Sequence, residues 1–115
     1  MNVKEFYKST GGNYESALAI MINDAFIEKM LEMFFSKNVY NDIISSYESK
    51  DFESLFKSAH SFKGVTGNLA LMPLFEISSA ITEATRSLEE VDIDKEIEEL
   101  KNKYLFIFNE YQKMK

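Results

Sequence analysis

His60 is the only histidine of this 115-residue chain, and the sequence contains no cysteine. An imidazole has an ordinary pKa of about 6.5, so the ring is largely neutral at pH 7 and can act as a nucleophile. Lys63 follows three residues later. On a helix this places an ammonium within one turn of the ring, where it would attract an anion. The two residues suggest a nucleophilic site that favours an anionic group.

Two glycines share the helical segment that carries His60. Gly64 and Gly67 lie four and seven residues after it, although a glycine inside a helix costs roughly 0.5–1 kcal/mol relative to alanine. At about 100° per residue, all three positions fall on one outer strip beside the buried face of the helix. The strip predicts an exposed imidazole over a bare surface that a partner can approach. Lys57 and Asn68 are the polar neighbours that could add contacts.

An ordinary structural explanation exists for each of these residues taken alone. A lone histidine in a helical protein is most often a surface or core residue without chemistry, and Lys63 would then belong to a solvated face. A single glycine most often marks close helix packing, and Gly67 with Asn68 could form a C-terminal cap that ends the helix. The shared outer strip favours function, but spacing alone leaves both explanations open.

The helix that must position His60 is expected from Phe52 to about Leu69, with Asp51 as its N-terminal cap. Its apolar residues recur at spacings of three and four, which is typical of a helix with one buried face. That expected buried face consists of Phe52, Leu55, Phe56, Ala59, Phe62, Thr66 and Leu69.

The rest of the chain also shows helical periodicity, broken by short polar or glycine-containing segments. Asn13 is the expected cap of one helix. Asp24 is the expected cap of the next, over residues 25–36, with Phe26, Met30, Met33 and Phe34 on its apolar side. Pro73 suits the first turn of a helix that runs to about residue 86. Further helices are expected over residues 1–8, from 39 to 47, and from Asp92 or Asp94 to the end.

These elements predict an all-α fold, an antiparallel four-helix bundle with additional short N-terminal helices. We expect one domain over residues 1–115. Its bundle core should span about residues 39–113, with the helices of residues 1–36 packing across one end or side.

Composition excludes several classes of function. A net charge of −6 argues against nucleic acid as a partner, because phosphate backbones need a basic face. Without cysteine there is no disulfide and no thiolate metal site. No run of about 18 apolar residues and no apolar signal core occur, so we expect a cytoplasmic protein that does not bind membranes. We also expect a monomer.

The run AHSFKG at residues 59–64, followed by Gly67, Asn68 and Leu69 and by the helix from Pro73, resembles the histidine-containing phosphotransfer (HPt) family. The hallmark of that family is an alanine-histidine-x-hydrophobic-lysine-glycine run. The likeness covers most of the chain from about Asn13. Ala70 departs from the pattern, because many members have glycine near this helix end.

The resemblance implies a phosphorelay intermediate without kinase activity of its own. His60 would accept a phosphoryl group from an aspartate of a response-regulator receiver domain and pass it to another receiver. Lys63 would support the phosphoryl charge, and Gly64, with Gly67, would leave room for the receiver. Lys57 and Asn68 would add docking contacts. No cofactor is expected on this chain, because Mg²⁺ would be bound by the receiver; a hybrid sensor histidine kinase is the other expected partner.

Functions of other classes fit less well. The dimerisation helix of a sensor kinase has an acid directly after its histidine, where this chain has Ser61. A di-metal carboxylate bundle needs paired Glu-x-x-His motifs, but Lys57 stands three residues before His60. No convincing set of nucleophile, base and orienting residue for a hydrolase is evident. The remaining alternative is an HPt-like docking or scaffold module that is not phosphorylated.

Overall fold

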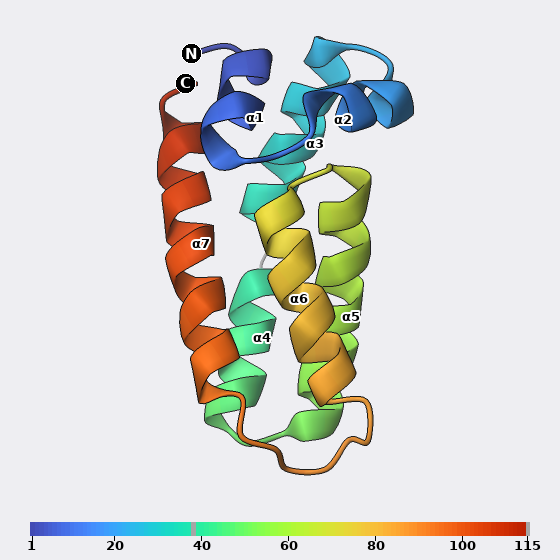
Figure 1. Cartoon of the computed structure of the whole chain (residues 1–115), viewed down its shortest axis with the longest axis vertical. Coiled ribbons are helices and arrows are strands. Elements are labelled where there is room, and N and C mark those ends of the chain that lie inside the picture. The colour runs from blue at the N-terminus through green and yellow to red at the C-terminus, as the bar shows by residue number, and fades with distance from the viewer. Residues whose placement is uncertain (38, 115) are drawn as a thin grey trace.

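The computed structural model describes residues 1–37 and 39–114, and over these residues it is helical with no strand. The expected all-α bundle is confirmed (Figure 1). The helices are α1 (Val3–Thr10), α2 (Tyr14–Met21), α3 (Asp24–Ser36), α4 (Val39–Glu48), α5 (Phe52–Asn68), α6 (Met72–Ala84) and α7 (Asp94–Gln112).

The bundle is elongated, with extents of 41 × 23 × 20 Å, and its long helices run along the longest axis (Figure 1). Helices α5 and α6 lie side by side and are joined by a short bend, and α7 runs along another side. Tyr40 of α4 stacks on Tyr104 of α7, with ring centroids 3.8 Å apart and planes within 2°. Helices α4, α5, α6 and α7 thus enclose one core.

Helix α3 departs from the expected arrangement. We expected residues 1–36 to pack across one end or side of the bundle, and α1 and α2 do lie across one end (Figure 1). Helix α3 instead continues the column of α4 along the bundle axis. Its Phe34 ring packs 5.5 Å from the Phe62 ring of α5 and 6.4 Å from that of Tyr104. The expected break at Lys37 and Asn38 involves Asn38, which lies outside the described residues.

The predicted start of α3 was wrong, and its predicted apolar face holds for Phe34 but not for Phe26 and Met33. Its cap is Asn23, whose side-chain oxygen accepts a hydrogen bond of 2.9 Å from the Phe26 backbone N–H. Asp24 is the first helical residue, and its carboxylate accepts from the Tyr14 hydroxyl. The buried residues of α3 are Ile27, Leu31 and Phe34, whereas Phe26 and Met33 are about 40% exposed. Two overlapping apolar stripes compete on this helix, and packing against the bundle selects one of them.

The caps predicted for the other helices were confirmed. Asp51 accepts from the Ser54 backbone N–H at 3.1 Å, and Asn13 accepts from that of Ser16 at 3.0 Å. Pro73 lies in the first turn of α6, where its missing N–H costs nothing. Helix α6 ends at Ala84, two residues earlier than expected.

The N-terminal helices fasten the bend between α5 and α6. The buried Tyr7 hydroxyl donates a 2.6 Å hydrogen bond to the Leu69 carbonyl, and burial raises the pKa of Tyr7. The Asn13 backbone N–H donates to the Ala70 carbonyl at 2.9 Å. Ala70 has φ of 53°, the left-handed region that favours glycine. Glycine in many HPt members therefore suits the conformation of this bend.

No helix among the described residues is long and apolar enough to cross a membrane.

We expect Tyr7→Phe to lower the free energy of unfolding by about 1–3 kcal/mol, because the buried Leu69 carbonyl loses its partner. Urea denaturation measures the change. Tyr14→Phe is the matched control, since it removes a hydroxyl hydrogen bond at an exposed position and should have little effect. Equal destabilisation by the two substitutions would contradict a special role for the buried bond.

Candidate functional site

Helix α5 presents His60 to solvent because the residues on its other face are buried in the core of the bundle. Leu55, Ala59 and Thr66 are fully buried, and His60 follows Ala59 on the exposed side. Its imidazole packs against the half-buried Phe56 ring one turn earlier, with centroids 5.9 Å apart. The ring is therefore held at the surface of a helix that is anchored along its other face.

Lys63 lies one turn after His60 and is half-buried. Within residues 1–37 and 39–114 it forms no direct ion pair. Its charge acts on Glu83 of α6, where it helps to lower the carboxyl pKa. Lys63 is thus one turn from His60 on α5, and its ammonium forms no ion pair with a described carboxylate.

Lys57 and Asn68 are both exposed, one on each side of His60 along α5. The Lys57 ammonium pairs with the Glu53 carboxylate at 3.2 Å. This pair is an exposed i, i+4 contact of the kind that contributes little. Asn68 stands at the end of α5 and lines a small apolar hollow between α3 and α5.

The two glycines have different surroundings. A Cβ atom added at Gly64 would meet nothing within 4 Å, so this position faces open space. A Cβ atom at Gly67 would lie 3.1 Å from two ring carbons of Phe75. Gly67 is half-buried and its missing side chain makes room for α6. The expectation that Gly67 extends the bare strip was wrong; the close-packing explanation fits it.

Two charged residues at the end of α6 approach the same surface, and sequence reasoning missed both. The Arg86 guanidinium lies over the Phe56 ring, 5.6 Å from its centroid. It donates two hydrogen bonds to the Glu83 carboxylate, at 2.6 and 3.2 Å. Their i, i+3 spacing was readable in the sequence, but their position beside Phe56 depends on how α5 and α6 align.

Comparison with protein families decides the identity of the chain. The family model described as Hpt domain matches residues 26–104. The chain belongs to the Hpt domain family. The matched segment begins in α3, includes α4, α5 and α6, and ends in α7. No curated protein and no solved structure matches the chain.

Hpt domains are phosphotransfer carriers of two-component systems, not kinases, and they interact with receiver and kinase domains. Membership gives this chain a phosphotransfer role of that general kind. The matched segment contains His60, whose side chain is exposed on α5.

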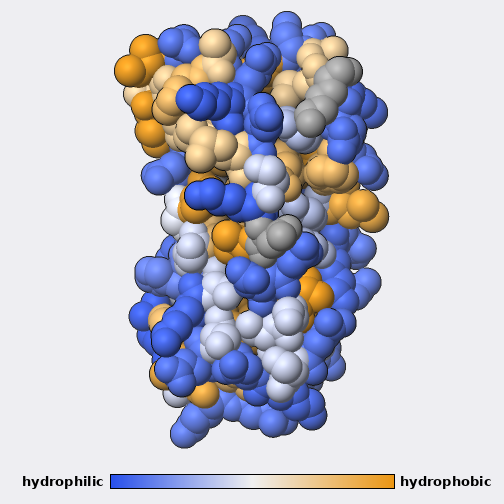
Figure 2. Space-filling model, turned by 180° about the vertical axis from the view of Figure 1, so that it is seen from behind, coloured by the Kyte–Doolittle hydropathy of each residue, from blue (hydrophilic) through white to orange (hydrophobic). Residues whose placement is uncertain are grey.

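An apolar surface of this Hpt domain lies beside Gly64. A hollow of about 220 Å³ is lined by residues of α2, α3 and α5, namely Met21, Met30, Met33, Phe34, Lys37, Val65, Asn68 and Leu69. Val65, which follows Gly64, is 38% exposed. Figure 2 shows hydrophobic residues gathered over the part of the back face formed by α2 and α3, above a mostly hydrophilic lower part. The exposed Met33 is part of this surface.

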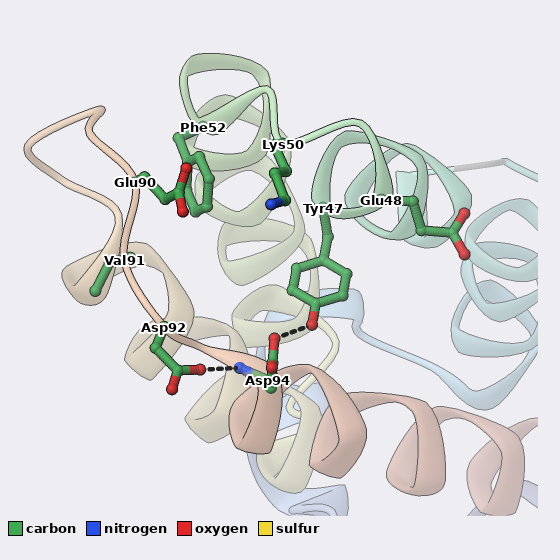
Figure 3. Close-up of a pocket in the computed structure, with 8 residues that line it drawn as sticks. All are labelled: Tyr47, Glu48, Lys50, Phe52, Glu90, Val91, Asp92 and Asp94. Carbon is green, nitrogen blue, oxygen red and sulfur yellow. Dashed lines mark hydrogen bonds between the residues drawn. The ribbon is translucent and has the colours of Figure 1, made fainter.

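A larger hollow, of about 450 Å³, lies between the α4–α5 turn and the segment before α7 (Figure 3), and His60 is not among the residues that line it. Its lining includes Glu48, Glu90, Asp92 and Asp94. The Tyr47 hydroxyl donates to Asp94, which raises the pKa of Tyr47 to about 12. Among the residues that the structure describes, no group of side chains is arranged to hold a metal ion.

The two glycines allow a test of the packing. Gly64→Ala should raise the free energy of unfolding by about 0.5–1 kcal/mol, because alanine favours the helix and meets no neighbour. Gly67→Ala should gain less or lose stability, because Phe75 must move. Urea denaturation of both variants gives the order, and a greater gain at Gly67 would contradict the assignment.

Proposed function

We propose that this Hpt domain accepts a phosphoryl group on His60 from the aspartate of a receiver domain and passes it to a second receiver. One observation carries the proposal: the imidazole is exposed on a rigid helix, inside the matched Hpt segment, next to the open surface at Gly64. A carrier needs an accessible nucleophile and a face that another protein can approach, and this position provides both.

The transfer forms a P–N bond to the imidazole nitrogen that carries no proton and breaks the P–O bond of the aspartyl phosphate. The aspartate leaves as a carboxylate, and the imidazole keeps its proton on the other nitrogen. Phosphoryl transfer requires positioning and charge stabilisation more than covalent help from the protein. In this proposal the receiver supplies Mg²⁺ and the aspartate, and the present chain supplies a positioned nucleophile and needs no cofactor.

Lys63 is the residue proposed to support the phosphoryl oxygens. It is one turn from His60 and its ammonium is not paired directly with a described carboxylate. A phosphorylated side chain carries a charge of about −1.5 to −2 at pH 7, so a nearby free cation stabilises it. Lys57 is proposed only to add a docking contact, and its exposed pair with Glu53 can open for it.

The receiver is proposed to dock over Gly64 and the neighbouring apolar surface. Gly64 lets the partner backbone approach α5 closely, and Val65 leads to the methionine-lined hollow. Methionine side chains adapt well to a partner surface because they are flexible and polarizable. Asn68, at the rim of the hollow, is placed to make a polar contact.

We expect His60→Gln to abolish acid-labile labelling from a panel of phosphorylated receivers while the melting temperature stays near that of the wild type. The side chain is exposed, so its loss should leave the core intact. Radiolabelled receivers and acid treatment of the product measure the transfer. Undiminished labelling of His60→Gln would contradict the assignment of His60 as the acceptor. If the wild type binds receivers but is not labelled, the scaffold alternative is favoured.

A second substitution tests the docking surface. Gly64→Gln should keep the fold, since glutamine favours a helix more than glycine does, but should slow transfer from receivers at least tenfold by obstructing their approach. Labelling by phosphoramidate, a small phosphoryl donor, should change much less. Ser61→Gln, which adds the same side chain at another exposed position of α5, serves as the position control. Transfer rates unaffected by Gly64→Gln would argue against clearance at this position.

A further inference from the structure

The position of Arg86 links α6 to the candidate acceptor. Its guanidinium lies 5.6 Å from the centroid of the Phe56 ring, and the His60 imidazole lies 5.9 Å from the same centroid. Both distances are measured from the same ring centroid. The distance between the guanidinium and the imidazole therefore cannot exceed their sum. Rotation about the bonds of the long, flexible arginine side chain can bring the guanidinium closer to the imidazole.

Glu83 holds the Arg86 guanidinium in the unphosphorylated chain. The carboxylate accepts two hydrogen bonds from the guanidinium, and this pairing lowers the carboxyl pKa and raises that of the guanidinium. Both side chains are more than half exposed. Exposed ion pairs are worth little, so the pair can open readily.

We propose that Arg86 leaves Glu83 when His60 is phosphorylated and binds the phosphoryl oxygens, so that the competition between the two anions sets the lifetime of the phosphohistidine. This inference rests on the proposed function of His60. It adds a second cation, from the turn after α6, to the one that Lys63 supplies from α5.

The charges favour the exchange of partners. The phosphoryl group carries up to two negative charges and three acceptor oxygens, whereas Glu83 carries one charge. The planar guanidinium can bind a phosphate through two N–H groups at once, and it can remain over an aromatic face while it moves. Lys63, which already acts on Glu83, would be drawn to the same phosphoryl group. No covalent bond is made or broken in this step.

A phosphoryl group that is bound through its oxygens should also leave more slowly. Transfer to water passes through a loose transition state in which the leaving group separates early. The bound phosphoryl group carries up to two negative charges on its oxygens, and these oxygens share less negative charge once a metaphosphate-like group separates. Cations bound to the oxygens therefore stabilise the ground state more than this transition state. Arg86 should therefore slow spontaneous loss of the phosphoryl group, and Glu83, by competing for Arg86, should hasten it.

The test uses the full chain phosphorylated with phosphoramidate, which removes any dependence on an unidentified receiver. We expect Arg86→Gln to shorten the half-life of the phosphohistidine by roughly two- to fivefold, the range of one exposed charge pair. Arg86→Lys should restore part of it, and Glu83→Gln should lengthen it. Lys103→Gln is the matched control, because it removes one positive charge from a similar exposed pair, with Glu99 on α7.

A phosphorus NMR titration separates direct binding from a structural effect. If Arg86 contacts the phosphoryl oxygens, Arg86→Gln should raise the pH midpoint of their second ionisation, while Lys103→Gln should not. A half-life and a midpoint that both stay at the wild-type values in Arg86→Gln would overturn this inference alone. A wild type that takes no label from phosphoramidate or from any receiver would overturn the proposed function and the inference with it.

Discussion

The packing of α5 against α6 is the constraint on which the site depends. Leu55, Ala59 and Thr66 must be buried, and this fixes the rotation of α5 about its own axis and turns His60 outward. The contact between Gly67 and Phe75 brings the two helices close together near their connection. Because the helices are antiparallel neighbours, the same contact determines which residues of α6 arrive beside His60.

The bend between the two helices is held from outside the matched segment. Tyr7 and Asn13 supply hydrogen bonds to the carbonyls of Leu69 and Ala70, although the Hpt match begins at residue 26. Those bonds satisfy carbonyl groups at a helix end, where the regular pattern fails. Helices α1 and α2 thus act on the site through the geometry of α5 and α6 without contacting His60.

Much of the fold was predictable because local patterns dominated it. The stripe of α5 and the caps at Asn13 and Asp51 are properties of short segments, and the structure confirms them except at Phe56, which was predicted to be buried and is half-buried. The failures have a common physical origin in packing between helices. The apolar residues of α3 allow two faces, and only contact with the bundle selects Ile27 over Phe26. Asn23 and Asp24 are both residue types that cap helices well. The Tyr14 hydroxyl donates a hydrogen bond to Asp24, and Asn23 caps the helix.

In the candidate site, too, features within one helix were predictable and features that depend on packing between helices were not. The exposure of His60 follows from the periodicity of α5, and the space at Gly64 follows from the same angular argument. Gly67 could not be separated from Gly64 in this way, because Phe75 comes from another helix. Arg86 lies near Phe56 only through the alignment of α5 with α6, and no pattern within a single segment encodes that alignment.

The arrangement of charge is suited to a site that is completed by a partner. Lys63 and Arg86 stand at a surface, where water weakens their effect on a neighbouring anion. A receiver that docks over Gly64 would exclude water from the same region and strengthen each of these interactions. The present chain can therefore keep its nucleophile exposed and its cations only loosely held, because the docked receiver would supply the Mg²⁺ and the aspartate that transfer requires.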